Sequence, residues 1–122
     1  MNAQNLVGGA ALVNNKLKFE CTVPNRPPFA VDYAKPLGDG EGIMSLELLL
    51  LSLATCMGST LKVLLDAQHR EVQELTIQVS GNRRETHPTG FERIHLDVRL
   101  RSEGLEANTL EEILGKPRWS VG

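Results

Sequence analysis

The sequence predicts an α+β fold: an antiparallel β-sheet with a long buried central helix and a second helix near the C-terminus. Three observations predict it. Alternating apolar and polar residues, typical of half-buried strands, occur on both sides of the chain's centre. Between them, the stretch Leu48–Leu61 is almost continuously apolar, as in a core helix. The glycine-rich segment Pro36–Gly42 separates the first strands from this helix and is expected to be a loop.

The first strands are expected to form a hairpin. Ala10–Val13 and Lys16–Val23 flank Asn14-Asn15, and paired asparagines tolerate the left-handed geometry of a tight turn. In the second arm every other residue is apolar, which is the period of a half-buried strand. Phe29–Tyr33 is expected to add a short third strand.

The second half begins with the long helix, predicted from Ser45 to about His69. Ser45 is its expected N-cap, and Glu47 suits the positive end of the helix dipole. Two alternating strands follow, centred on Ile77 and Leu96. A last helix is expected from Asn108 to Gly115, because Glu111 follows Asn108 in a pattern that resembles a capping box.

Length and composition limit the class of protein. The 122 residues fit a single domain, 1–122, with 41% hydrophobic and 23% charged residues. A net charge of −2 argues against a nucleic-acid-binding protein. No signal peptide is evident, and Leu48–Leu61 is shorter than the about 20 apolar residues of a membrane span. We therefore expect a cytoplasmic protein, bound neither to nucleic acid nor to a membrane, whose two cysteines are reduced.

Cys56, inside the apolar helix, is the main candidate for chemistry. At 100° per residue, Ser52, Ser59 and Thr60 fall on the same side of the helix as Cys56. These hydroxyl residues and the adjacent Met57 are candidate substrate contacts. A reactive thiol with hydrogen-bonding neighbours is one interpretation. The other is a buried core cysteine, with hydroxyls that bond back to the helix's own carbonyl groups.

Glu47 is the only acid in the apolar part of the helix, but it cannot touch Cys56. Nine residues place it on the opposite face, about 13.5 Å along the axis, so it could act only through a bridge such as an arginine. Cys21 lies on the apolar side of its strand and is either a core residue or a partner of Cys56 in a disulfide. No metal or cofactor is expected, because the histidines lack ligand spacing and the glycine-rich segment matches no phosphate-binding motif.

The central segment resembles the signature of the OsmC/Ohr superfamily. The residues that carry the resemblance are Pro36-Leu37-Gly38 through Gly42, Glu47-Leu48-Leu49-Leu50 and Leu53-Ala54-Thr55-Cys56. The similarity covers about residues 10–114, whereas the tail, 115–122, diverges. The resemblance implies an OsmC-like fold, an intertwined homodimer with long central helices between β-sheets, and active sites at the dimer interface.

The resemblance also implies roles for the candidate residues. Cys56 would be the peroxidatic thiolate that reduces an organic hydroperoxide, and Glu47 would hold an arginine that stabilises this thiolate. The family's resolving cysteine, expected after the last helix, is missing, so Cys21 or an external thiol reductant would take its place. The only arginine before the helix is Arg26, which leaves Lys16 or Lys18 as imperfect substitutes for the family arginine.

These departures keep other functions open. One alternative is a non-catalytic dimer of this fold that binds a small apolar ligand, which the apolar helix favours. The other alternative is a module that binds a protein partner, which would cover an exposed sheet edge.

Overall fold

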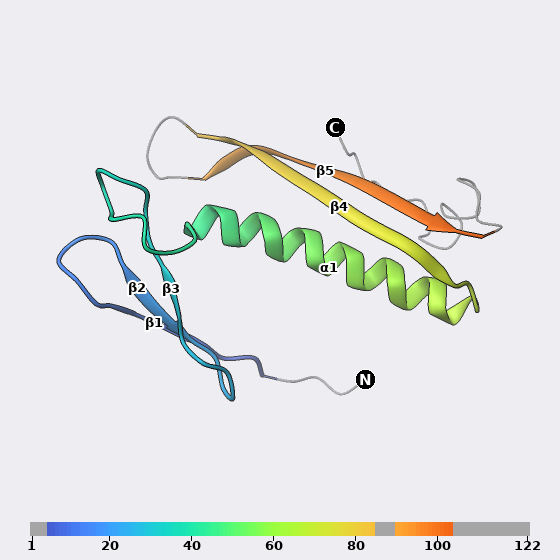
Figure 1. The fold of residues 1–122 in the computed structure, drawn as a ribbon, viewed down its shortest axis with the longest axis horizontal. Coiled ribbons are helices and arrows are strands. Elements are labelled where there is room, and N and C mark those ends of the chain that lie inside the picture. Colours follow the sequence, from blue (N-terminus) through green and yellow to red (C-terminus); the bar gives the residue numbers. More distant parts are fainter. Residues whose placement is uncertain (1–4, 85–89, 104–122) are drawn as a thin grey trace. The chain divides into compact units, whose positions relative to one another are not determined.

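The computed structural model describes residues 5–84 and 90–103. They form two compact units, the first ending at Leu48 and the second beginning at Leu49 (Figure 1). The helix expected at Asn108–Gly115 and the tail 115–122 lie outside the described residues. The remaining elements follow the predicted order of three strands, a helix and two strands.

The first unit contains a three-stranded antiparallel sheet. Its strands β1 (Gly9–Leu12), β2 (Phe19–Thr22) and β3 (Phe29–Val31) are neighbours in chain order. The register places Leu12 beside Phe19 and Phe19 beside Val31. Directly opposed residues share a face, so one face of this sheet is apolar.

The hairpin between β1 and β2 has a longer loop than predicted, and the second strand begins at Phe19 rather than Lys16. The side chain of Asn14 explains the difference. Its Oδ1 accepts hydrogen bonds from the backbone N–H groups of Lys16 and Lys18, at 2.9 and 3.2 Å. The Val13 N–H also donates to the Lys18 carbonyl, at 2.9 Å. Asn14 therefore organises a wider loop in place of the expected Asn14-Asn15 turn.

Helix α1 (Ser45–Ala67) has defined caps at both ends. Met44, not Ser45, is the N-cap, because its carbonyl accepts the first helical hydrogen bond, from Leu48. At the other end His69 is left-handed, with φ of 57°. The bonds from His69 N to the Asp66 carbonyl and from Arg70 N to the Leu65 carbonyl complete a Schellman motif, so the helix ends two residues earlier than predicted.

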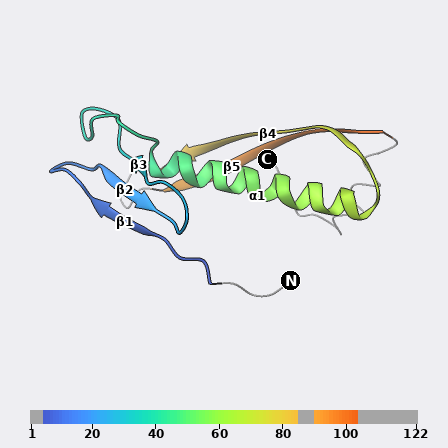
Figure 2. The ribbon, with the colours of Figure 1, turned by 60° about the horizontal axis from the view of Figure 1, so that its bottom comes forward.

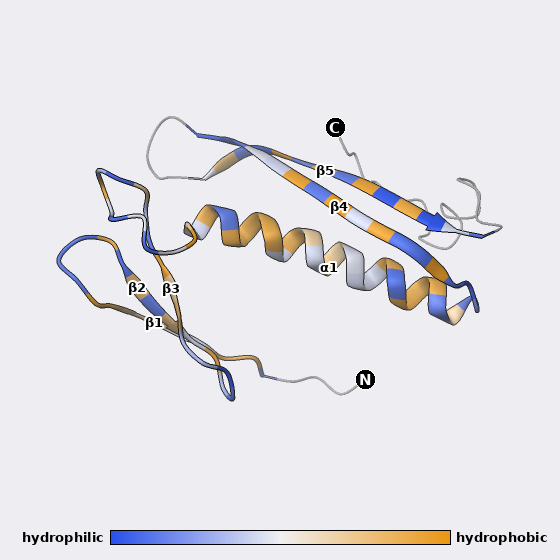
Figure 3. Cartoon of the chain, in the orientation of Figure 1, coloured by the Kyte–Doolittle hydropathy of each residue, from blue (hydrophilic) through white to orange (hydrophobic). Residues whose placement is uncertain are grey.

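In the second unit, β4 (Val72–Arg83) and β5 (Phe91–Ser102) form a long antiparallel hairpin, which Figure 2 shows running alongside α1. The strands alternate between hydrophobic and hydrophilic residues, as predicted (Figure 3). The helix buries Ala54, Leu61 and Leu65, which share a face with Gly58. A Cβ atom on Gly58 would lie 3.2 Å from Cδ1 of Ile77 in β4, so this face packs on the hairpin.

The length and apolar composition of α1 would also allow it to cross a membrane. The helix extends beyond the apolar stretch Leu48–Leu61 on which the sequence prediction was based. Core helices of soluble proteins meet the same criterion, so it does not assign α1 to a membrane.

Candidate functional site

Cys56 lies on the side of α1 that faces away from the β4–β5 hairpin. It is two residues, or about 200°, from the buried Ala54. Its thiol is free and the residue is exposed within this chain. The interpretation of Cys56 as a core residue of the single chain is therefore wrong. The sequence could not decide this, because the burial of a helix position depends on which face the hairpin covers.

Two of the three predicted hydroxyl neighbours of Cys56, Ser52 and Thr60, bond to the helix backbone, as the second interpretation of this segment predicted. Ser52 donates to the Leu49 carbonyl at 2.8 Å, and Thr60 donates to the carbonyl of Cys56 at 3.0 Å. Ser59 is exposed on the same side of α1, whereas Met57 is half-buried. The candidate substrate contacts thus surround Cys56 on a face that mixes small polar and apolar side chains.

Glu47 makes a local contact at the start of the same helix. Its Oε1 accepts a hydrogen bond from the backbone N–H of Met44, at 3.0 Å. This is one half of a capping box, with Glu47 at the third helical position. Within residues 5–84 and 90–103, no ion pair joins Glu47 to an arginine. Its role as an arginine anchor stays a prediction.

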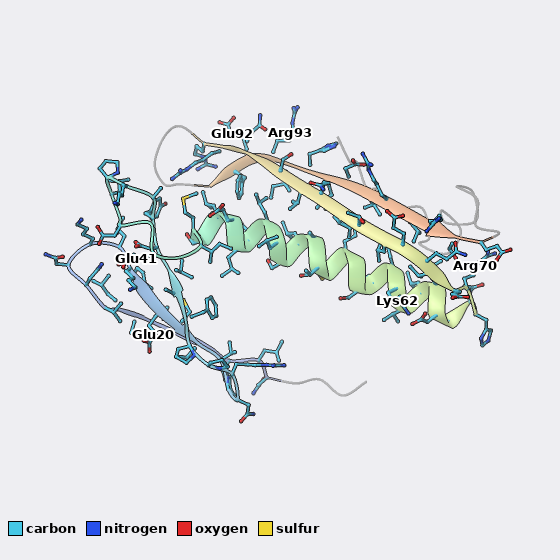
Figure 4. The ribbon with its side chains drawn as sticks, viewed as in Figure 1. Glu20, Glu41, Lys62, Arg70, Glu92 and Arg93 are labelled. Carbon is cyan, nitrogen blue, oxygen red and sulfur yellow. The ribbon has the colours of Figure 1, made fainter. Side chains whose placement is uncertain are left out.

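The two lysines considered as substitutes for the family arginine each have an acidic partner in the loop before α1. Lys16 Nζ lies 2.6 Å from Asp39 Oδ1, and Lys18 Nζ lies 3.6 Å from Glu41 Oε1. Figure 4 labels Glu41 on this loop. The hydrogen bond and the charge of Asp39 raise the pKa of Lys16. Both ammonium groups are thus paired within the first unit.

Asp32, at the end of β3, organises that loop. Its side chain is buried, with 1% of the residue exposed. The carboxylate accepts hydrogen bonds from the backbone N–H groups of Tyr33, Asp39 and Glu41, at 2.7, 3.2 and 3.1 Å. Burial opposes ionisation, but these hydrogen bonds and the Lys18 charge outweigh it and hold the pKa of Asp32 below its usual range. An acid that ends an apolar strand before a glycine-rich segment was the available signal for this role.

The first unit also contains a cavity of about 310 Å³ over the apolar face of its sheet. Cys21, half-buried in β2, is part of its wall. The lining residues are Ala10, Leu17, Phe19, Cys21, Val31, Asp32, Tyr33, Ser45 and Leu48. Cys21 belongs to the first unit and Cys56 to the second, so a resolving role for Cys21 stays a prediction.

No metal site is found in the part of the chain that the structure describes. No three of its His, Cys, Asp and Glu residues are grouped so that they could hold a metal ion.

Solved structures share this fold at low sequence identity. An OsmC-like protein from Mycoplasma pneumoniae is 22% identical with a TM-score of 0.75, covering 90% of this chain and 78% of its own. An organic hydroperoxide resistance protein from Legionella pneumophila is 16% identical with a TM-score of 0.64. The alignment covers 95% of this chain and 83% of that protein. An organic hydroperoxide resistance protein from Elizabethkingia anophelis, with bound thiocyanate, is 15% identical with a TM-score of 0.62. The alignment covers 94% of this chain and 81% of that protein.

A comparison with curated proteins gives no significant match. The sequence profile described as OsmC-like protein, however, matches residues 38–116, which is more than half of the chain. The match includes Gly38–Gly42 of the glycine-rich loop, Glu47 and Cys56, which carry most of the sequence resemblance. The chain therefore belongs to the OsmC-like protein family.

Proposed function

We propose that this protein is a thiol-dependent hydroperoxide reductase in which Cys56 is the peroxidatic residue. The observation that carries the proposal is the free, exposed thiol of Cys56 on the long helix of an OsmC-like chain. Two proteins of the same fold are named organic hydroperoxide resistance proteins, which supports this chemistry as the first to test.

The first step oxidises Cys56 and reduces the peroxide. The thiolate sulfur attacks the terminal oxygen of an organic hydroperoxide, a sulfur–oxygen bond forms, and the oxygen–oxygen bond breaks. Cys56 becomes a sulfenic acid, and the departing alkoxide takes a proton to leave as an alcohol. Two electrons pass from sulfur to the peroxide, so the step needs no metal or cofactor.

The second step requires a reductant. A thiol condenses with the sulfenic acid, releasing water and forming a disulfide with Cys56, and a second thiol then breaks that disulfide. We assign both thiols to an external small thiol or dithiol, with Cys21 as the alternative source of the first. A sulfenic acid that meets no thiol would be oxidised further to sulfinic acid, which is not reversed by ordinary thiols.

We also propose that the protein acts as a homodimer. The side of α1 that carries Cys56 exposes the apolar residues Leu49, Leu53 and Val63, the last by 65%. Burial of such a face against a second copy is favourable by about 25 cal/mol per Å² of apolar surface. The cytoplasm is the proposed location, because thiols are kept reduced there. Neither nucleic acid nor a membrane is part of this proposal.

A steady-state assay with matched cysteine variants tests the function. Purified protein is mixed with cumene hydroperoxide and dithiothreitol, and alcohol production is followed by chromatography. Cys56→Ser is expected to lower turnover to the uncatalysed rate, whereas Cys21→Ser should retain it if an external thiol resolves Cys56. Unchanged turnover in Cys56→Ser would refute the proposed role of Cys56. A parent protein that does not exceed the uncatalysed rate would favour a non-catalytic member of the family.

A further inference from the structure

We infer that Asp39-Gly40, in the loop that joins β3 to α1, is a site of isoaspartate formation, and that contacts within the first unit suppress the reaction (Figure 1). This spontaneous rearrangement of the backbone is easiest where glycine follows aspartate, because no side chain then blocks the attacking nitrogen. The dipeptide occurs once among the 122 residues, and no asparagine is followed by glycine. The inference does not depend on the chemistry of Cys56.

The rearrangement exchanges only water. The Gly40 backbone nitrogen attacks the side-chain carbon Cγ of Asp39, and a five-membered succinimide ring closes. One carboxyl oxygen leaves as water, with the Gly40 N–H proton and one proton from solvent. Water then adds to either carbonyl group of the ring. One product is the original aspartate, and the other is isoaspartate, whose main chain runs through the former side chain.

The conformation of the loop explains why this susceptible sequence is present. Gly40 has a φ of 67°, in the left-handed region that glycine adopts without steric cost. The residue is exposed, and a Cβ atom built on it would have no neighbour within 4 Å. Asp39 is half-buried. Water can reach both residues, so any protection has to come from the contacts that they make.

Both reacting groups are engaged by other partners. The Gly40 N–H donates to the Tyr33 carbonyl at 2.9 Å. On the side chain, Asp39 Oδ1 accepts a hydrogen bond from the Lys16 ammonium group at 2.6 Å. The succinimide has neither the N–H proton nor the negative charge, so both contacts are lost when the ring closes. The folded loop therefore opposes the reaction at each of its two reacting groups.

The backbone on either side of Gly40 is held by the buried Asp32 carboxylate. Its Oδ2 accepts hydrogen bonds from the N–H groups of Asp39 and Glu41, at 3.2 and 3.1 Å. Three consecutive N–H groups are thus engaged, which resists the backbone rotation that ring closure needs. An isoaspartate would add one carbon atom to the main chain between the two N–H groups that bind Asp32. The modification would therefore loosen the loop that leads into α1.

Ageing of matched lysine variants tests the inference. Full-length proteins are kept at physiological temperature and neutral pH, and isoaspartate is quantified with protein isoaspartate methyltransferase and radiolabelled S-adenosylmethionine. Lys16→Ala should raise the rate about two- to fivefold, the factor that the strength of an exposed ion pair allows. Lys18 pairs with Glu41 instead, at 3.6 Å, so Lys18→Ala should stay near the parent rate. Lys16→Arg keeps a cation and should also retain the parent rate.

Two further measurements assign the signal to this dipeptide and to its folded state. Asp39→Glu cannot close a five-membered ring and should remove most of the label. The parent protein in urea should isomerise at least about tenfold faster than the folded parent, because the three N–H contacts are then absent. Circular dichroism verifies that the variants are folded. Equal rates in Lys16→Ala and Lys18→Ala, persistent label in Asp39→Glu, or equal rates with and without urea would overturn the inference.

Discussion

Glu47 accepts the backbone N–H of Met44 at 3.0 Å, so the residue that the family resemblance assigns to an arginine also caps α1. Capping uses one carboxylate oxygen. Within residues 5–84 and 90–103 the other oxygen accepts no hydrogen bond, so it can still accept one from a basic group. One side chain can therefore serve both the stability of the helix start and the proposed reaction, and substitutions can separate the two.

Glu47→Ala removes both the cap and the charge, whereas Glu47→Gln keeps an oxygen that can accept the Met44 N–H. We expect Glu47→Ala to lower the free energy of unfolding by about 1 kcal/mol, and Glu47→Gln to lower it by less than about 0.5 kcal/mol. Peroxide turnover should fall in both, because neither side chain can pair with an arginine. Urea unfolding and the cumene hydroperoxide assay measure the two effects. Full turnover in Glu47→Gln would leave Glu47 with a capping role alone.

Gly38 is buried where the loop passes close to β3. A Cβ atom there would collide with the Tyr33 carbonyl oxygen and with Oδ1 of Asp32. Neither group is the end of a flexible side chain, so Gly38→Ala is expected to cost about 2 kcal/mol in urea unfolding. Gly9→Ala is the control: its Cβ would meet Thr22 Oγ1 at 3.6 Å, an ordinary contact. Similar stabilities for the two variants would show that the loop can move away.

Asp32 should make stability depend on acid pH. Its pKa is lower in the folded state than the ordinary value of 3.8, so its contribution is fully present above that pH. The contribution is lost as the pH falls through the lowered pKa of the folded state. Thermal unfolding of the parent protein and Asp32→Asn should therefore differ most near neutral pH and converge below pH 3.8. A difference that is constant with pH would mean that the Asp32 charge does not stabilise the loop.

His69 is left-handed at the end of α1, a conformation that costs a residue with a Cβ atom about 1–2 kcal/mol. His69→Gly removes that cost and should raise the free energy of unfolding by about 1 kcal/mol. Gln68→Gly, one residue earlier, should lower it. Thermal or urea unfolding of the pair provides the measurement. A loss of stability in both variants would indicate that the His69 side chain makes a contribution of its own.

Val63 tests the proposed dimer. It is 65% exposed and lies about 180° around α1 from the buried Ala54. Val63→Glu should leave a single chain folded but weaken dimerisation about tenfold or more, because a charge would be buried against an apolar surface. Gln78→Glu, the control, makes the same change in charge on β4 and should leave dimerisation unchanged. Light scattering across a dilution series measures dimerisation of the two variants, and equal dimerisation would place the interface elsewhere.

The fold was predictable where a residue's neighbours in sequence decide its environment. The alternation around Ile77 and Leu96 gives the two long strands, and the apolar stretch gives α1. The errors are at the ends of elements. Side chains there bond to backbone groups nearby, as Asn14 does in the hairpin loop and Glu47 does at Met44. Such bonds move a strand or helix boundary without changing the hydrophobic pattern.

The candidate site was less predictable than the fold. The family resemblance identified Cys56 and Glu47, but no local pattern shows that Cys56 is on the exposed side of α1. The role of Asp32 in the loop could not be predicted, because two of its three partners are backbone N–H groups seven and nine residues further along the chain. The cavity depends on strand register and on the first turn of α1, which composition does not specify.

The back-bonded hydroxyls of α1 limit what the surface around Cys56 can recognise. Ser52 and Thr60 direct their protons to backbone carbonyl groups, at 2.8 and 3.0 Å. Their oxygens keep lone pairs, so towards an arriving molecule they act as acceptors only. A hydroperoxide carries a proton that such an oxygen can bind, whereas a dialkyl peroxide carries none. At Ser52 and Thr60 the helix backbone thus leaves acceptor oxygens, which favour ligands with a proton to donate.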